Sequence, residues 1–195
     1  MEKDRLLAFT DGVIAIIITI MVLELKVPQE PTLAGLVSVW PVFVSYILSF
    51  LYIAIYWNNH HHFFHLVRRV DGALLWANMH LLFWLSLVPF ATGWMGENHF
   101  AALPTALYGV VLLMAAIAYF VLELAIIRVQ GPGSLLRKAV GRDWKGKLSP
   151  LFYIAAIVAT LWSPWVAEAI YVLVALLWLI PDRRIERVFS GGGAQ

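Results

Sequence analysis

The chain has 195 residues, of which 62% are hydrophobic and 13% charged, with a formal net charge of +2 and no cysteine. Soluble domains carry about a quarter charged residues, and a globule of this size cannot hide so large an apolar excess in its core. The composition therefore excludes a soluble enzyme and a disordered chain, and the missing cysteines exclude disulfides, thiolate metal sites and cysteine nucleophiles. We expect an integral membrane protein.

Six apolar segments are long enough to cross all or most of a bilayer core that is about 30 Å thick. They cover residues 6–25, 33–57, 73–94, 101–127, 148–162 and 165–180. Ser163 and Pro164 separate the last two and predict a tight turn, because proline lacks the donor that a helix interior needs. We predict an all-α integral membrane domain of six transmembrane helices within residues 1–189, followed by a flexible tail at 190–195.

Basic residues are distributed unevenly around these segments. Six spans place both termini, and the loops after the second and fourth segments, on one side of the membrane, and this side holds every lysine and arginine except Lys26. Cytoplasmic loops carry such an excess, so both termini are predicted to be cytoplasmic. The basic loop at 128–147 is explained by this topology and by contact with anionic lipids of the bilayer, and no nucleic-acid partner is expected.

Polar residues inside the apolar segments are the candidates for function, because a charge at membrane depth is costly and needs a partner. Asp11 lies about a turn and a half inside the first segment, about 120° around the helix from Arg5, which shares one face with Phe9. Two interpretations remain open on spacing. Thr10 or Asp11 caps the helix, whose dipole favours a carboxylate there, or Asp11 pairs with a group on a neighbouring helix.

Four histidines lie close together at the end of the second segment. His61 and His65 are four residues apart, a spacing at which two imidazoles can bind one metal ion from the same helix face. No carboxylate follows at a useful spacing, so we favour instead a histidine that pairs with Asp11, with His60 and His61 as alternatives. Three polar residues of the third segment are expected to form hydrogen bonds between helices: Asn78, His80 and Ser86.

Five residues of the first segment form one stripe at helical spacing: Gly12, Ile16, Thr19, Ile20 and Leu23. Ordinary packing is one interpretation. A pore seam is the other, because copies of this helix around an axis would stack rings of isoleucine and leucine that gate by dewetting, with Thr19 as a single polar ring. Glu24 lies at the end of this segment, either at a pore mouth that attracts cations or at a solvated helix end.

The first segment resembles a known family. Arg5-x-x-x-Phe9-Thr10-Asp11 is similar to the R-x-x-x-F-S-D signature of the transmembrane protein 175 family, which comprises endosomal and lysosomal potassium channels of animals and single-repeat prokaryotic relatives. The match continues through residues 12–28, and Trp57-x-x-His60 resembles the tryptophan–histidine element of the family's second helix. Thr10 replaces the serine of the signature and retains a hydroxyl.

The resemblance implies a role for each matching residue. Ile16 falls at the family's isoleucine constriction, Ile20 and Leu23 form further hydrophobic rings above it, and Thr19 matches a hydroxyl used in cation selectivity. Gly12 belongs to the same pore-lining stripe. A structural network that holds the pore helix comprises Arg5, Phe9, Thr10, Asp11, Trp57 and His60. The resemblance also implies a homotetramer in which the first helix lines a central pore.

We therefore predict a passive, potassium-preferring cation channel with a hydrophobic gate, located in a prokaryotic inner membrane. It is not expected to be an enzyme or to hold a cofactor, and K⁺ is its permeant ion. The Thr-Val-Gly-Tyr-Gly stretch of a carbonyl-lined filter does not occur in the sequence. One alternative is a proton-coupled secondary transporter that uses Asp11 and the histidines, although repeats around a charged midplane site are not visible. The other is a membrane enzyme with a histidine-bound metal.

Overall fold

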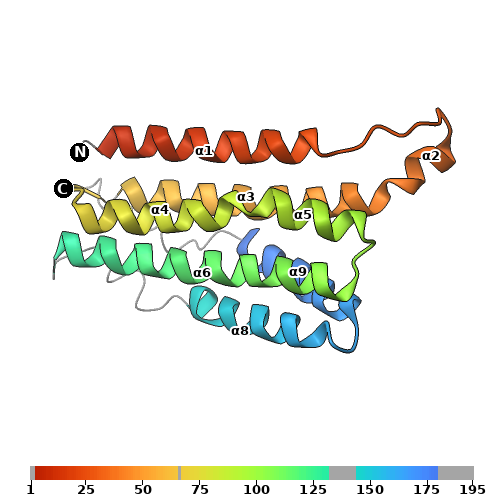
Figure 1. Cartoon of the computed structure of the whole chain (residues 1–195). Helices are drawn as coiled ribbons and strands as arrows, with labels where there is room; N and C mark the ends of the chain where they lie inside the picture. Colours follow the sequence, from red (N-terminus) through yellow and green to blue (C-terminus); the bar gives the residue numbers. More distant parts are fainter. Residues whose placement is uncertain (1–2, 66, 132–143, 180–195) are drawn as a thin grey trace.

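The structure is a computed structural model that describes residues 3–65, 67–131 and 144–179. Eight helices make up these residues: α1 (Lys3–Leu23), α2 (Leu33–Ser38), α3 (Trp40–His65), α4 (Gly72–Ser86), α5 (Val88–Glu97), α6 (Ala102–Gln130), α8 (Trp144–Ala159) and α9 (Pro164–Leu179). The predicted tail at 190–195 and most of the basic loop at 128–147 lie outside the described residues. All the long helices run along one common direction, and α1 lies at one edge of the bundle (Figure 1).

The observed helices follow the six predicted segments, with two interruptions. The second segment divides at Val39 into α2 and α3, and the third divides at Leu87 into α4 and α5. Pro89 stands at the start of α5 and lacks the N–H that would continue α4 through this point. The tight turn predicted at Ser163 and Pro164 is present, because α8 ends at Ala159 and Pro164 begins α9.

The second helix extends much further than the sequence indicated. We predicted its end near Trp57, but α3 continues to His65 and includes the whole histidine run. Asparagine and histidine are weaker helix formers than leucine, yet nothing in residues 58–65 breaks a helix. Trp57 therefore lies inside α3, two turns from its end, and not at a helix terminus.

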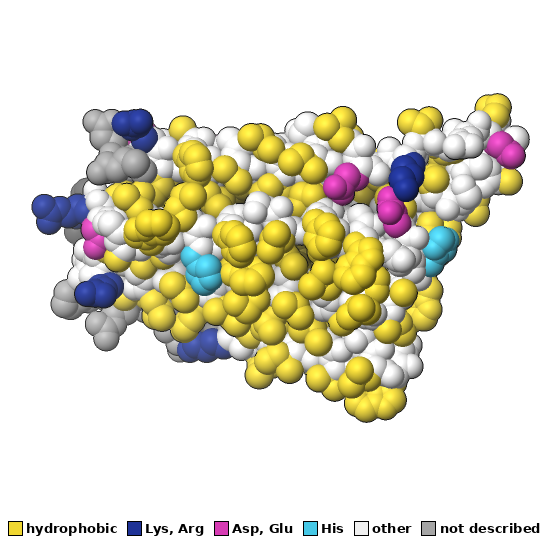
Figure 2. Space-filling model, in the orientation of Figure 1, with side chains coloured by type: hydrophobic (Ala, Val, Ile, Leu, Met, Phe, Trp, Pro, Cys, Tyr) yellow, Lys and Arg dark blue, Asp and Glu magenta, His cyan; other side chains and the backbone are white. Residues whose placement is uncertain are grey.

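Four elements of the described chain are long and apolar enough to cross a membrane: α1, α3, α4 together with α5, and α6. Helices α8 and α9 have 16 residues each. Hydrophobic side chains cover most of the face shown in Figure 2, and charged side chains gather toward its two ends. This is the surface of a multi-pass integral membrane protein.

Helix α6 is the centre of the bundle and packs against α4, α5, α8 and α9. Gly109 allows α9 to approach closely, because a Cβ at this position would collide with the Tyr171 hydroxyl. That hydroxyl donates a hydrogen bond to the Thr105 carbonyl of α6 at 3.1 Å. The Tyr52 hydroxyl of α3 in turn donates to the Tyr171 carbonyl at 2.7 Å. These buried bonds fix α3, α6 and α9 as a rigid unit, because bonds between helices have little competition from water in a membrane.

Among the described helices, α1 packs mainly against α3, α4 and α5. It buries one face in this contact, through Leu6, Thr10, Ile14, Ile17 and Met21. Leu7, Val13 and Ile18 are half-buried at the borders of this contact, and the opposite face of the helix is exposed. The most specific motifs of the sequence therefore lie on a helix with a large exposed face.

Candidate pore helix and its polar anchor

The stripe predicted on the first helix lies on the uncovered side of α1. Gly12 and Thr19 are exposed, and Ile16, Ile20 and Leu23 expose 60%, 41% and 78% of their surfaces. Packing inside the subunit therefore does not explain the stripe. An isolated subunit would leave this surface to lipid, and an assembly around α1 would enclose it.

Thr19 presents its hydroxyl in a defined orientation. Its Oγ1 donates a hydrogen bond to the Ala15 carbonyl one turn earlier, at 2.8 Å. The single proton of the hydroxyl is thereby used within the helix, and the oxygen lone pairs remain available toward the exposed side. This arrangement can accept a hydrogen bond from water or contact a cation.

The buried side of α1 carries a chain of polar side chains that crosses three helices. The Asn78 side-chain Nδ2 on α4 donates to Thr10 Oγ1 at 2.9 Å. The Asn78 Oδ1 lies 2.8 Å from His60 Nε2 on α3, and because that oxygen accepts, His60 carries its proton on Nε2. Thr10, Asn78 and His60 are each at most 2% exposed. We call these three residues the polar anchor of α1.

Asp11 makes a separate connection to α3. The indole Nε1 of Trp57 donates to Asp11 Oδ1 at 2.9 Å, and the Trp57 ring stacks on His61 with centroids 5.9 Å apart. The capping interpretation of Thr10 and Asp11 is wrong, because α1 begins at Lys3, two turns earlier. Asp11 is therefore joined to a neighbouring helix.

The partner that we favoured for Asp11 is also different from the one observed. Among the described hydrogen bonds, Asp11 accepts from Trp57, and His60 is bonded to Asn78. His61 faces its neighbours on α3. From the sequence we expected Asn78 to form a hydrogen bond between helices but did not name its partners. Its amide inside an apolar helix was the signal that it belongs with Thr10 and His60.

Arg5 and Phe9 are not brought into the polar anchor. Both are exposed, and Phe9 exposes 51% of its surface. No hydrogen bond or ion pair joins Arg5 to Asp11 within the part of the chain that the structure describes. Of the six residues expected in the network, four make side-chain hydrogen bonds between helices, in two separate groups: Thr10 and His60 each bond to Asn78, and Trp57 bonds to Asp11.

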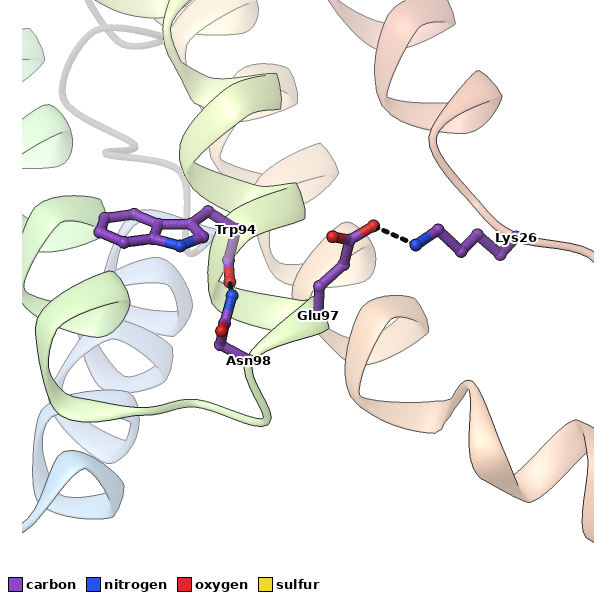
Figure 3. Close-up of polar contacts among 4 residues, drawn as sticks. All are labelled: Lys26, Trp94, Glu97 and Asn98. Carbon is purple, nitrogen blue, oxygen red and sulfur yellow. Dashed lines mark hydrogen bonds and ion pairs between the residues drawn. The ribbon is translucent and has the colours of Figure 1, made fainter.

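The other end of α1 leads into a small charged cluster. Lys26 Nζ forms an ion pair with Glu97 Oε1 at the end of α5, at 2.6 Å, beside Asn98, whose Nδ2 donates to the Trp94 carbonyl at 2.8 Å (Figure 3). The Glu24 carboxylate lies against α5 beside Gly93. Partial burial and the nearby negative charge of Glu97 raise the pKa of Glu24 above its ordinary value. Glu24 follows Leu23 directly, so this carboxylate stands where the exposed stripe ends.

Comparisons with known proteins cover the part of the chain that holds these residues. The family model described as endosomal/lysosomal potassium channel TMEM175 matches residues 5–89, which include the stripe and the polar anchor. A potassium channel of a Chryseobacterium species is 55% identical over 187 residues, covering 96% of this chain and 97% of the relative. A potassium channel of Streptomyces collinus is 39% identical over 129 residues, which are 60% of this chain and 61% of that protein.

A solved structure extends the likeness to the whole fold. The crystal structure of a lysosomal potassium-selective channel TMEM175 homolog from Chamaesiphon minutus superimposes with a TM-score of 0.82 and 29% sequence identity. The match covers 92% of this chain and 97% of that one. Together with the Chryseobacterium relative, it shows that the chain belongs to the TMEM175 family of potassium channels.

Proposed function

We propose that the chain is the subunit of a passive, potassium-preferring cation channel in which four copies of α1 surround the conduit. The observation that carries this proposal is the division of α1 into two faces. One face is buried against α3, α4 and α5, and the other exposes a continuous apolar stripe with one hydroxyl. A single apolar helix cannot enclose a conduit, so the proposal requires a homo-oligomer, and the tetramer is what the family resemblance implies.

The proposed topology has six spans with both termini in the cytoplasm of a bacterial cell, in its inner membrane. Helices α8 and α9, with 16 residues each, measure about 24 Å and can span a bilayer that thins locally around them. The unequal distribution of lysine and arginine supports this orientation. It places the polar anchor at the cytoplasmic half of α1, and Glu24 at the outer mouth.

In this arrangement the gate is a series of hydrophobic rings. Four copies of Ile16, Ile20 and Leu23 would each form a ring of branched side chains that expels water, and an ion cannot pass a dewetted constriction. Thr19 would supply a ring of hydroxyl oxygens between two of these rings. A Cβ added at Gly12 would meet no atom of the subunit within 4 Å, so neighbouring copies of α1 can approach closely at this level.

The other two functions have less support. A proton-coupled transporter needs a titratable site near the membrane midplane, whereas Asp11 and His60 lie toward one end of the bundle. For the enzyme, the described residues hold no group of three or more histidine, aspartate and glutamate side chains that could bind a metal ion.

Replacing Ile16 with asparagine tests the proposed gate. A polar ring at the constriction lowers the cost of wetting it, so Ile16→Asn should raise K⁺ flux through purified protein in liposomes at least about tenfold and admit larger cations. Val22→Asn is the matched control, because Val22 is exposed on the same helix but lies off the stripe. Unchanged flux in the Ile16 variant, or an equal rise in both, would contradict the gate.

Replacing Thr10 tests whether the polar anchor holds the pore helix. Thr10→Val conserves shape but removes the oxygen that accepts from Asn78, and a buried unsatisfied donor costs about 1–3 kcal/mol. We expect a lower melting temperature in detergent and reduced K⁺ flux. Thr10→Ser retains the hydroxyl and should stay close to the original protein in both measurements. An anchor without function would leave the valine variant as stable and active as the serine variant.

The raised pKa of Glu24 predicts a pH dependence. The folded protein disfavours the charged carboxylate, so Glu24 becomes neutral at a less acidic pH than an ordinary glutamate. Acidifying the outer side should then lower K⁺ conductance, because a neutral mouth no longer concentrates cations, and the effect should weaken at high salt. Glu24→Gln should have low conductance throughout and lose this pH step. Glu30→Gln, at an exposed position further along the chain, should retain it, and identical profiles for all three proteins would refute the assignment.

A further inference from the structure

The polar anchor uses one histidine of the run in α3 and leaves the others with no assigned role. His61 and His65 are both exposed on the last two turns of α3. Their Nε2 atoms point at each other across 2.9 Å. The ring centroids are 4.4 Å apart, and the ring planes are nearly perpendicular at 87°. The two side chains therefore converge on one point of the surface.

This geometry is close to that of two imidazoles on one metal ion. Zinc binds histidine nitrogen at about 2.0–2.1 Å, so two such bonds at angles between 90° and the tetrahedral value separate the nitrogens by about 2.9–3.4 Å. Small rotations of the exposed side chains can bring the two Nε2 atoms from the observed separation to the one that a shared zinc ion requires. The negative end of the α3 dipole also favours a cation at this position.

A metal ion can replace the shared hydrogen-bond proton while both imidazoles stay neutral. Two neutral imidazoles joined through their Nε2 atoms share one N–H proton, donated by one ring to the other. In the metal-bound state both Nε2 lone pairs face the ion, and the displaced proton is held on Nδ1 of the ring that donated it, with solvent as carrier. Both rings stay neutral, as ligands must be.

We propose that His61 and His65 form a surface site for a divalent transition metal ion of the zinc, copper or nickel class, with water in the remaining coordination positions. Imidazole ligands suit these ions. Two protein ligands leave the site open, so it binds reversibly. The site requires nothing from the proposed channel activity, and it depends only on the two side chains that the structure brings together.

Neighbouring charges determine how strongly such a site binds. The Lys3 ammonium on α1 and the imidazole of His62 both act electrostatically on His65. Lys3 opposes a bound cation, so Lys3→Gln should strengthen metal binding. His62 is held elsewhere, because its Nδ1 lies 2.7 Å from the Asn58 carbonyl. It is the matched control within the same run.

The site is connected to α1 through two contacts. His61 stacks on Trp57, and Trp57 donates its indole N–H to Asp11. An ion that fixes the His61 ring therefore acts on the side chain that attaches Asp11 to α3. Resting on the proposed function, we infer that the bound ion alters K⁺ flux through this connection.

Calorimetric titration of purified, tag-free protein with Zn²⁺ alone tests the site. We expect one ion per subunit, an affinity at least about tenfold weaker in His61→Ala and in His65→Ala, and an affinity within about twofold of the original in His62→Ala. Cu²⁺ should bind at the same residues with higher affinity. Equal binding by His61→Ala, or equal loss in His62→Ala, would overturn the site.

A liposome flux assay tests the connection separately. Zn²⁺ should change K⁺ flux in the original protein and leave it unchanged in His61→Ala. Trp57→Phe should still bind Zn²⁺ but show a smaller relative change in flux, because its ring lacks the N–H that reaches Asp11. Zinc binding without any change in a conducting protein would refute the connection and retain the site. A protein that binds zinc but conducts nothing would instead refute the proposed function.

Discussion

Hydrogen bonds to α3 and α4 hold α1 in place and determine which way its exposed stripe faces. Lipid tails are as apolar as leucine, so burial of Ile14 or Ile17 does not by itself fix a helix in a membrane. The chain from Thr10 through Asn78 to His60 fixes one half of α1 in a definite rotation. Near the other end, Lys26 is joined to Glu97. The exposed stripe lies between these attachments, and its direction is set by them.

The bundle consists of a rigid scaffold and one helix, α1, that is attached to its side. Tyr52, Tyr171 and the closely packed Gly109 fix α3, α6 and α9 as a scaffold, and α1 is attached to the side of this scaffold that α3, α4 and α5 provide. Helix α1 is thereby held against one side of the bundle while its stripe stays exposed, as the proposed role in a pore requires. The proposed metal site at His61 and His65 would lie next to one of these attachments, the hydrogen bond from Trp57 to Asp11.

Hydropathy predicted most of the helical layout, because apolar length and proline position are properties of the sequence alone. The end of α3 was missed, since polar residues up to His65 lower hydropathy without breaking a helix. The division at Leu87 was missed because Pro89 falls inside a strongly apolar run. In the candidate site, the helical spacing of the sequence identified the stripe on α1, but the histidine predicted as the partner of Asp11 was wrong. A shared position near the cytoplasmic ends of the two helices suggested a histidine, whereas only the packed structure shows that the Trp57 indole reaches the carboxylate. The number of copies around α1 depends on surfaces between subunits, which one chain does not contain.

In the proposed assembly, the exposed stripe of α1 lines the conduit through which water and ions pass when the channel conducts. The sequence contains no cysteine, so single cysteines can be introduced along α1 without background and treated with a charged, water-soluble thiol reagent during flux recording. We expect Ile16→Cys, Ile20→Cys and Leu23→Cys to react in the conducting channel, so that modification alters K⁺ flux, and Val22→Cys to stay unmodified in lipid. Modification at Val22 with no reaction at the three stripe positions would show that α1 does not line the conduit with this face.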